Sequence, residues 1–311
     1  MRVKTRALGI ALGVAADAAL GDPERHHPVA WFGRWASTLE QRLWADDMRR
    51  GAGYTAATVA PVLAVGVLAE RASRGHPAAH VAATALATWA VLGARSLSHE
   101  GDVMADRLEV GDLAKARAQL PNLCGRDAAQ LDAPELARAA VESMAENTAD
   151  AVVASLFWGA VAGIPGLLGH RAVNTLDAMV GHRNQRYRSF GTASARLDDA
   201  LDYVPARLTG LLATVLAPVV GGSASRTWAV LRRDRRKHPS PNGGWCESAW
   251  AGALGVQLGG TNVYASRVEE RGLLGDGPRP GAGDVRRAAR LVRWVTVAAT
   301  ALAAAAAGRK R

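Results

Sequence analysis

Acidic side chains recur at helical spacing just before one of the long apolar stretches of the chain. Glu142, Glu146 and Asp150 are four residues apart, which places all of their carboxylates on one face of a helix. Three carboxylates on one face repel each other, and Arg138, one turn before Glu142, can neutralise only one of them. Mg²⁺ binds carboxylates together with substrate phosphates, so the pattern predicts a metal and nucleotide site, with a solvated helix face as the alternative.

A second polar face follows the same apolar stretch. Arg171, Asn174 and Asp177 are spaced three residues apart, so a helix would present them side by side. The segment Gly181–Arg188 then adds clustered arginines, which suit a phosphorylated substrate because guanidinium groups form paired hydrogen bonds with phosphate. The alternative is a positively charged flank of a membrane helix. The arginines concerned are Arg183, Arg186 and Arg188.

Two further segments carry groups that could bind a metal or transfer a proton. Asp198 and Asp202 are four residues apart with Asp199 between them, which predicts a second metal-binding face. Near the N-terminus, Gly21–Val29 holds histidines and carboxylates between prolines that restrict the backbone. For that segment a rigid turn with solvated charges remains an equal alternative.

The segment Ser240–Glu247 contains a glycine pair that leads into the apolar stretch Ala249–Gly255. Backbone N–H groups at such a helix start could bind an anion. The basic run Arg232–His238 just before it lacks the interleaved aromatic residues and the recognisable module of a nucleic-acid-binding protein. We therefore interpret it as a signal for membrane orientation, and we expect no nucleic-acid partner.

Other signatures of nucleotide-binding and hydrolytic enzymes are missing from the sequence. No GxxxxGK[ST], GxSxG or HExxH motif occurs, and the chain has only 4 lysines against 34 arginines. A nucleotide would therefore be held by arginines and metal-bound carboxylates. The 2 cysteines, Cys124 and Cys246, exclude a disulfide framework.

Long apolar runs must position these polar segments. Of the 311 residues, 49% are hydrophobic, and the runs approach the roughly 20 residues that cross a bilayer as a helix. The chain is therefore predicted to be an all-α, polytopic membrane protein with about four to six apolar helices, forming a single membrane-embedded domain over residues 1–311. A soluble helical protein is the alternative, because the runs are rich in alanine. The runs are Ala7–Leu20, Ala52–Ala69, Pro77–Ala94, Ala151–Gly169, Leu208–Gly222 and Leu291–Gly308.

Glycine and proline interrupt two of the runs, which indicates broken helices. Ala151–Gly169 contains Gly163-Ile-Pro-Gly166, and Leu208–Gly222 contains Pro218. If every run crossed the bilayer, the polar segments before and after Ala151–Gly169 would lie on opposite sides. We therefore expect these two runs to enter the membrane and return or to lie among the other helices, which leaves four spanning helices. The segment Lys237–Gly283 is rich in glycine and proline and is predicted to be a long structured loop.

Taken together, the motifs resemble the membrane-embedded cobalamin biosynthesis family of adenosylcobinamide-phosphate synthases. The similar blocks occur in the family's order through most of the chain. Met144, Ala151, Ser155 and Cys246 stand where the family pattern leads us to expect valine, glycine, proline and proline. The blocks are Gly21–Pro23 with His27–Val29 and Gly33, Gly125–Asp127 with Glu142–Asp150, Arg171–Asp177, Ala193–Asp199, Pro205–Arg207 and Ser240–Trp245.

The resemblance implies an amide-forming ligase. It would attach aminopropanol or its phosphate to the propionate carboxylate of adenosylcobyric acid, with ATP as co-substrate and Mg²⁺ as the metal. A carboxylate is a poor acyl donor, so activation as an acyl phosphate is the natural route. A general base must then deprotonate the amine, and His27 and Asp177 are the candidates.

The motifs assign catalytic, metal-binding and substrate-binding roles to individual residues. The catalytic group is His27, Glu142, Glu146 and Asp177, and the metal ligands are Glu142, Glu146, Asp150, Asp198 and Asp199. The substrate-binding residues are Asp22, Asn147, Arg171, Asn174, Arg183, Arg186, Arg188, Arg196 and Asn242.

We expect the corrinoid, aminopropanol phosphate, membrane lipid and other late cobalamin-pathway enzymes as partners. The expected location is the cell membrane, with the active site facing the cytoplasm, where ATP and corrins occur. A transporter and a non-catalytic scaffold for late-pathway enzymes are the alternative functions. The sequence shows no inverted repeat, which counts against the transporter.

Overall fold

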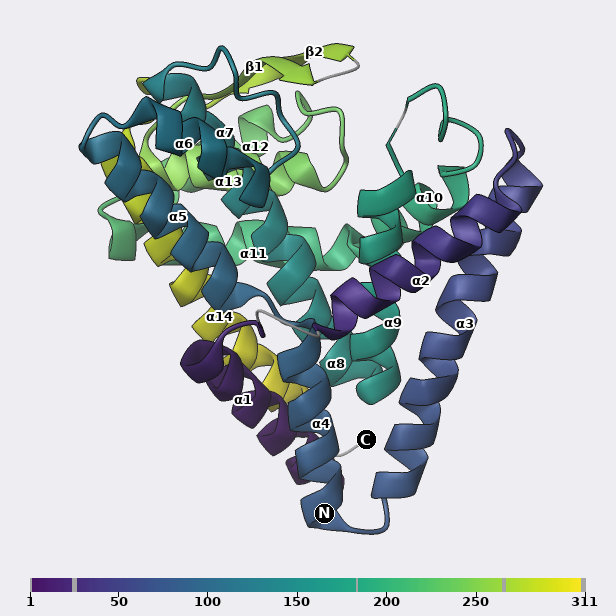
Figure 1. Ribbon diagram of the computed structural model, residues 1–311. Coiled ribbons are helices and arrows are strands. Elements are labelled where there is room, and N and C mark those ends of the chain that lie inside the picture. Colours follow the sequence, from purple (N-terminus) through teal and green to yellow (C-terminus); the bar gives the residue numbers. More distant parts are fainter. Residues whose placement is uncertain (1, 24–26, 183, 265–266, 309–311) are drawn as a thin grey trace. The chain divides into compact units, whose positions relative to one another are not determined.

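The computed structural model describes residues 2–23, 27–182, 184–264 and 267–308, and helices dominate it (Figure 1). The first helices are α1 (Arg2–Leu20), α2 (Pro28–Leu43), α3 (Met48–Ser73), α4 (Pro77–Val91), α5 (Ala94–Glu109), α6 (Leu113–Gln119) and α7 (Ala133–Thr148). They are followed by α8 (Ala154–Ala162), α9 (Ile164–Val180), α10 (Thr192–Leu201), α11 (Tyr203–Leu216), α12 (Ala224–Asp234), α13 (Gly243–Leu254) and α14 (Ala282–Gly308). Short 3₁₀ turns at Leu120–Asn122 and Ala217–Val220 and a π-helical turn at Ala149–Val153 complete the helical part.

Four segments of the described chain are long and apolar enough to cross a membrane. This finding confirms the predicted all-α polytopic membrane protein. The expected set of spanning helices was wrong at two places. The run Ala7–Leu20 was expected to span, but α1 is not among these segments because it carries Arg2, Lys4, Arg6 and Asp17. The run Leu208–Gly222 was expected not to span, but Tyr203–Val220 is among them. The segments are Met48–Ser73, Pro77–Glu109, Tyr203–Val220 and Ala282–Gly308.

The predicted break in the run Ala151–Gly169 is confirmed. Gly163 separates α8 from α9 and has a φ of 71°, a conformation that side chains disfavour. A Cβ atom there would also lie 2.7 Å from Glu70 Oε2 and 2.7 Å from an Arg6 guanidinium nitrogen. The same Glu70 oxygen accepts the N–H of Ile164 at 3.1 Å and thereby caps the start of α9. Near Pro218, α11 likewise ends and becomes a 3₁₀ turn.

The chain forms two compact units, each assembled from separate parts of the sequence. The first unit comprises Met1–Gly93, Ala154–Asp202 and Ala299–Arg311, and the second comprises Ala94–Val153 and Tyr203–Ala298.

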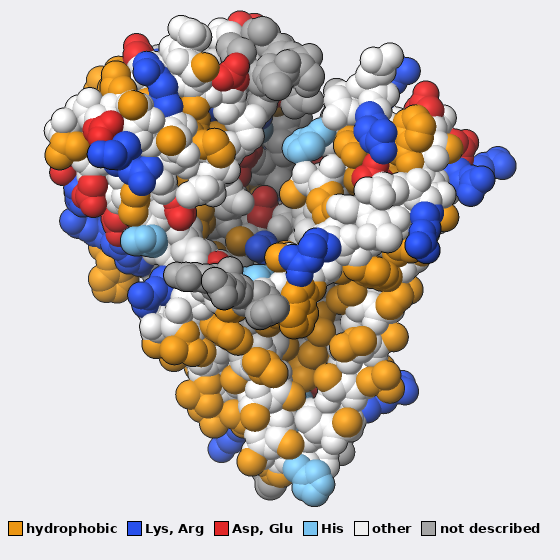
Figure 2. All heavy atoms as spheres, in the orientation of Figure 1, with side chains coloured by type: hydrophobic (Ala, Val, Ile, Leu, Met, Phe, Trp, Pro, Cys, Tyr) orange, Lys and Arg blue, Asp and Glu red, His pale blue; other side chains and the backbone are white. Residues whose placement is uncertain are grey.

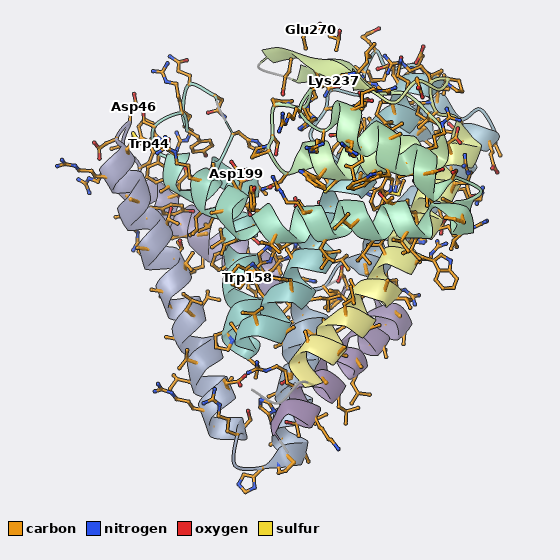
Figure 3. The ribbon with its side chains drawn as sticks, turned by 180° about the vertical axis from the view of Figure 1, so that it is seen from behind. Trp44, Asp46, Trp158, Asp199, Lys237 and Glu270 are labelled. Carbon is orange, nitrogen blue, oxygen red and sulfur yellow. The ribbon has the colours of Figure 1, made fainter. Side chains whose placement is uncertain are left out.

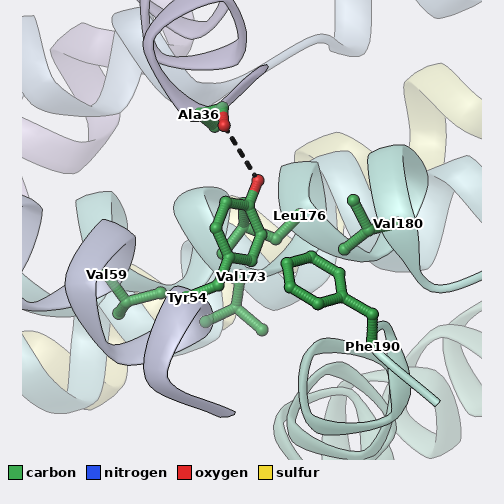
Figure 4. Close-up of a cluster of buried hydrophobic side chains, with 7 residues drawn as sticks. All are labelled: Ala36, Tyr54, Val59, Val173, Leu176, Val180 and Phe190. Atoms are coloured by element: carbon green, nitrogen blue, oxygen red, sulfur yellow. Dashed lines mark hydrogen bonds between the residues drawn. The ribbon is translucent and has the colours of Figure 1, made fainter. Parts of the chain in front are cut away.

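The core of the first unit is formed where α3 packs on α9 (Figure 4). The ring of Tyr54 on α3 lies 5.0 Å from that of Phe190, between apolar side chains of α9. Its hydroxyl group donates a hydrogen bond to the backbone oxygen of Ala36 on α2 at 3.2 Å. A buried tyrosine needs such a partner, so this contact fixes α2 against the pair α3 and α9.

The outward faces of α3 and α4 are apolar. Figure 2 shows hydrophobic side chains gathered over these two helices. Exposed examples are Leu63, Val65 and Leu68 on α3 and Leu86 on α4. Contiguous apolar surface of this kind marks contact with lipid or another protein, and lipid agrees with the length of these segments.

The second unit is organised around α13, which packs against α7, α11 and α12. Trp250 at its centre is fully buried. The segment Lys237–Gly283, predicted to be one long loop, instead contains α13 and a hairpin of two antiparallel strands, β1 (Leu258–Tyr264) and β2 (Arg267–Leu274). In this hairpin Gly260 pairs with Arg271, which brings the Arg271 side chain back to the start of α13.

Candidate functional site

The structure distributes the predicted site residues over both units. The first unit holds Asp22, His27, Arg171, Asn174, Asp177, Arg186, Arg188, Arg196, Asp198 and Asp199. The second unit holds Glu142, Glu146, Asn147, Asp150 and Asn242. Arg183 lies outside the described residues.

In the second unit, Glu142 is compensated by protein groups. Its buried carboxylate forms ion pairs with Arg138, at 3.2 Å, and with Arg126. Glu142 Oε1 also accepts the N–H of Gly259 on β1 at 2.7 Å. Glu142 therefore needs no metal to compensate its charge, and that part of the prediction is wrong. Two arginines neutralise it, Arg138 on the same helix and Arg126 from the segment before the helix.

Asp150 and Asn147 also differ from the predicted arrangement. The α-helix ends at Thr148, and Asp150 belongs to the π-helical turn Ala149–Val153, so the spacing that predicted a shared face with Glu142 does not continue. The Asn147 amide donates back to the Ser143 backbone oxygen at 2.9 Å.

Glu146 meets two residues that the sequence motifs did not assign. One carboxylate oxygen of Glu146, one of Glu247 and a ring nitrogen of His238 all lie within 4.8 Å of one another. His238 Nε2 is 3.2 Å from Glu247 Oε1 and 3.8 Å from Glu146 Oε1. His238 and Glu247 are buried, whereas 35% of the Glu146 side chain is exposed. We call Glu146, His238 and Glu247 the α7–α13 triad.

Arg271 brings a positive charge from β2 into the triad. One of its guanidinium nitrogens lies 2.9 Å from His238 Nε2, 3.2 Å from Glu247 Oε1 and 3.9 Å from Glu146 Oε1. Each of these contacts joins segments far apart in sequence. In the sequence, the only features that pointed to this cluster were Glu247 at the end of Ser240–Glu247 and His238 at the end of the basic run Arg232–His238.

The triad contains ionisable groups with shifted pKa values. Partial loss of water around its carboxylate raises the pKa of Glu146 to about 7, and the charge of Glu247 adds to this effect. Burial would lower the pKa of His238, but the carboxylates of Glu247 and Glu146 outweigh it and raise that pKa. Burial would raise the pKa of Glu247, yet His238 and Arg271 hold it below its usual range. The arrangement can therefore bind a cation or exchange a proton near neutral pH.

In the first unit, α9 and α10 bring a set of oxygen-bearing side chains together. The Asn174 amide donates to Asp198 Oδ1 at 3.4 Å, and Asn174 Oδ1 accepts from Arg171 at 3.2 Å. Burial raises the pKa of Asp177 to about 6. Burial also raises the pKa of Asp198 well above its usual value, and the charges of Asp202 and Asp177 add to that shift. We call Asn174, Asp177, Asp198 and Asp202 the α9–α10 acidic group.

A glycine positions Asp177 in this group. Gly181 directly follows α9, and its N–H bonds to the Asp177 backbone oxygen at 2.7 Å. A Cβ atom on Gly181 would lie 1.9 Å from Asp177 Oδ1 and 2.7 Å from that backbone oxygen. Any side chain at this position would therefore displace the Asp177 carboxylate.

Asp202 connects the acidic group to a buried histidine. His170 Nε2 lies 2.8 Å from Asp202 Oδ1, and His170 Nδ1 lies 3.5 Å from Ser155 Oγ. All three side chains are buried, which does not suit a serine nucleophile that must meet a substrate. Asp202 Oδ2 is also buried, and within the described part of the chain it has no hydrogen-bond partner.

The N-terminal motif forms a helix cap. His27 Nδ1 accepts the N–H of Val29 at the start of α2, at 3.1 Å. Its other ring nitrogen lies 3.4 Å from Asp22 Oδ1. The structure thus pairs the two predicted residues of this segment, and both ring nitrogens of His27 contact protein groups.

The arginines predicted to bind phosphate have different surroundings. Arg186 forms hydrogen bonds with Glu40 Oε1 at 2.8 and 3.1 Å and lies over the ring of Trp44. Arg188, Arg196 and Asp199 are exposed, the last labelled on α10 in Figure 3.

The start of α13 does not present free donors to an anion. The hydroxyl group of Ser240 accepts the N–H groups of Asn242 at 3.2 Å and Gly243 at 3.1 Å. The Ser240 backbone oxygen accepts the N–H of Gly244 at 3.4 Å. The predicted anion site is therefore already occupied by Ser240. Asn242 instead accepts a hydrogen bond from Arg207 at 2.6 Å through its side-chain oxygen.

Fold and polar groups together define a polytopic α-helical membrane protein with a cluster of ionisable side chains in each unit. Residues 10–292 match the family model described as CobD/Cbib protein, and the chain belongs to this family. It is 50% identical over 309 residues to the cobalamin biosynthesis protein CobD of Mycobacterium tuberculosis, covering 99% of this chain and 98% of that protein. The CobD proteins of Geobacter metallireducens and Rhodobacter capsulatus are 45% and 42% identical, over 86% and 91% of both chains. No solved structure matches the chain.

Proposed function

We propose that this protein is an adenosylcobinamide-phosphate synthase. It joins aminopropanol, or its phosphate, through an amide bond to the propionate carboxylate of adenosylcobyric acid, with ATP as co-substrate. The similarity to a cobalamin biosynthesis protein over 99% of the chain carries the proposal, because it supports the same pathway for the whole chain. The apolar segments support a location in the cell membrane, and we propose that the polar groups face the cytoplasm.

The α9–α10 acidic group suits the Mg²⁺ that accompanies ATP. Mg²⁺ prefers oxygen ligands, and Asn174, Asp198 and Asp202 offer amide and carboxylate oxygens. The buried Asp202 Oδ2 has no hydrogen-bond partner among the described residues. The pKa of Asp198 is raised because burial and the neighbouring carboxylates disfavour its ionised form, which a bound cation would stabilise. When bound, ATP would supply the phosphoryl group that makes the carboxylate an effective acyl donor, and Mg²⁺ would stabilise the charge on that group.

Asp177 is the better of the two candidates for the general base. The amine nitrogen must lose a proton before it can attack the activated carboxylate, and a base with a pKa near the working pH does this best. The pKa of Asp177 is about 6. His27, in contrast, already accepts a backbone N–H and contacts Asp22. We propose that Arg171 binds the phosphate groups of the substrates.

An assay with purified protein in detergent tests the proposal. Adenosylcobyric acid, Mg-ATP and either aminopropanol or its phosphate are supplied, and the corrinoid product is identified by its mass. Asp177→Asn should lower product formation by a factor of about 10² or more. Asp46→Asn, an exposed carboxylate of the same unit, should not change it. Absence of the amide product from the wild-type protein would favour the transporter or scaffold alternative.

A further inference from the structure

We propose that the α7–α13 triad of Glu146, His238 and Glu247 binds a divalent transition-metal ion, distinct from the Mg²⁺ that we assign to ATP. Among the histidine, cysteine and acidic side chains of the described part of the chain, these three form the one group whose ligand atoms all lie within 4.8 Å of one another. Two of its members lie outside every motif that suggested a metal site in the sequence.

The donor atoms already lie near the separations found around a bound ion. Metal bonds of 2.0–2.2 Å to imidazole and carboxylate place neighbouring donors roughly 3 to 3.5 Å apart. The separation of His238 Nε2 from Glu247 Oε1 is 3.2 Å, and that from Glu146 Oε1 is 3.8 Å. A shift of a few tenths of an ångström by the partly exposed Glu146 would complete the set.

Glu247 gives an independent indication of a missing cationic partner. Its side chain is 0% exposed, and the second oxygen, Oε2, has no hydrogen-bond partner among the described residues. A buried carboxylate oxygen without a partner is costly, and coordination is one of the ways in which proteins compensate buried charge.

Arg271 acts as an internal cation at the same place. Its guanidinium nitrogen contacts the donor atoms of His238 and Glu247 from β2 and lies 3.9 Å from Glu146 Oε1. Those contacts show that the three donors favour a positive charge between them. A metal ion and Arg271 therefore compete, and the metal is expected to displace this side chain.

The imidazole determines the class of metal. Mg²⁺ and Ca²⁺ prefer ligand sets made of oxygen, whereas first-row ions such as Mn²⁺ and Zn²⁺ accept imidazole together with carboxylates. His238 Nδ1 lies 3.0 Å from the Ser240 backbone nitrogen, whose N–H donates to it, and 3.3 Å from the Ser240 backbone oxygen. Coordination through Nε2 therefore requires the tautomer in which Nδ1 carries the ring N–H and donates it to that oxygen instead. Three protein ligands leave positions for water or a substrate oxygen, as in catalytic metal sites.

Metal titration without nucleotide tests the site separately from the enzymatic activity. The full chain is purified in detergent, stripped with a chelator and titrated with MnCl₂ while free Mn²⁺ is followed by electron paramagnetic resonance. The wild-type protein should bind one Mn²⁺ tightly, Zn²⁺ should displace it, and excess Mg²⁺ should displace it poorly. Glu146→Gln and His238→Gln should weaken binding by a factor of about ten or more.

Two further variants serve as comparisons. Arg271→Gln should bind Mn²⁺ at least as tightly as the wild-type protein, because the competing guanidinium is removed. Glu270→Gln, a neighbouring carboxylate on β2 that bonds to Thr261, should behave like the wild-type protein. Glu146 is partly exposed, so its variant should fold even if His238→Gln does not, which size-exclusion chromatography checks. Absence of Mn²⁺ and Zn²⁺ binding, equal binding by Glu146→Gln, or equally effective displacement by Mg²⁺ would overturn the proposal, whatever the synthase assay gives.

Discussion

The guanidinium of Arg186 lies 2.8 Å from Glu40 Oε1, although 146 residues separate them in the sequence. The hydroxyl group of Tyr187 donates to the same oxygen at 3.1 Å. The segment after α9 is thereby attached to α2, next to Trp44 (Figure 3). This contact gives Arg186 a structural role that the sequence did not predict.

Glu40→Gln and Arg186→Gln should therefore both lower the melting temperature in detergent, because each removes one partner of the same contact. The KM values for both substrates should change little. Arg188→Gln, an exposed arginine of the same segment, is the control and should leave the melting temperature unchanged. A selective rise in KM for the phosphorylated amine in Arg186→Gln, at normal stability, would restore the phosphate-binding role.

Glu142 and Glu146, one helical turn apart, should respond differently to the same substitution. Glu142→Gln removes the counter-charge of the buried Arg126 and Arg138 and should lower the free energy of unfolding by about 3 kcal/mol or more. Glu146→Gln should leave stability nearly unchanged and lower metal binding. Thermal unfolding and Mn²⁺ titration of both variants measure these two different effects. Similar loss of stability in both would contradict it.

Asp234 should make stability depend on pH. Burial alone would raise the pKa of Asp234, but Arg233, Lys237 and the N–H of Gly275 hold it far below its ordinary value. The ionised group therefore stabilises the fold above pH about 4, and this contribution is lost as the pH falls further towards the folded-state pKa.

The melting temperatures of Asp234→Asn and the wild-type protein should accordingly differ most near pH 7, and the gap should narrow below pH about 4. Asp276→Asn, which changes an exposed partner of Arg233, should give a smaller difference. A gap that is constant between pH 7 and pH 3 would show that the charge of Asp234 is unimportant.

Gly163→Ala should destabilise the break between α8 and α9. The backbone conformation is one that only glycine adopts readily, at a cost of about 1–3 kcal/mol for other residues, and the added Cβ meets Glu70 and Arg6. Gly75→Ala, in the connection between α3 and α4, is the matched control because nothing lies within 4 Å of its Cβ position. Equal melting temperatures for the two variants would argue against a required break.

Cysteine labelling of intact cells tests the proposed topology. On a background without Cys124 and Cys246, single cysteines at the exposed positions Gln130 and Gln185 should both resist a reagent that cannot cross the membrane. Both should react after the cells are opened. Labelling of Gln185→Cys from outside would contradict a common cytoplasmic face.

The sequence by itself determined the features that depend on neighbouring residues. Apolar length predicted the helices of a membrane protein, and Gly163 predicted the interruption between α8 and α9, because local backbone freedom decides both. The three-residue spacing of Arg171, Asn174 and Asp177 predicted their common helix for the same reason. The order of motifs indicated the family, which the comparisons confirm.

Only the tertiary structure decided which charges meet. Arg126 compensates Glu142, and Glu146 meets His238 and Glu247, which lie about a hundred residues further along the chain. The spacing of acidic residues along α7 could not reveal these partners, because the balance of charge in a site depends on groups brought in from other helices and from β2. The predicted metal face included Glu146, which the structure places beside His238 and Glu247, but it was wrong about the neutralisation of Glu142. Packing, and not the periodicity of one helix, selects the partners of a buried charge.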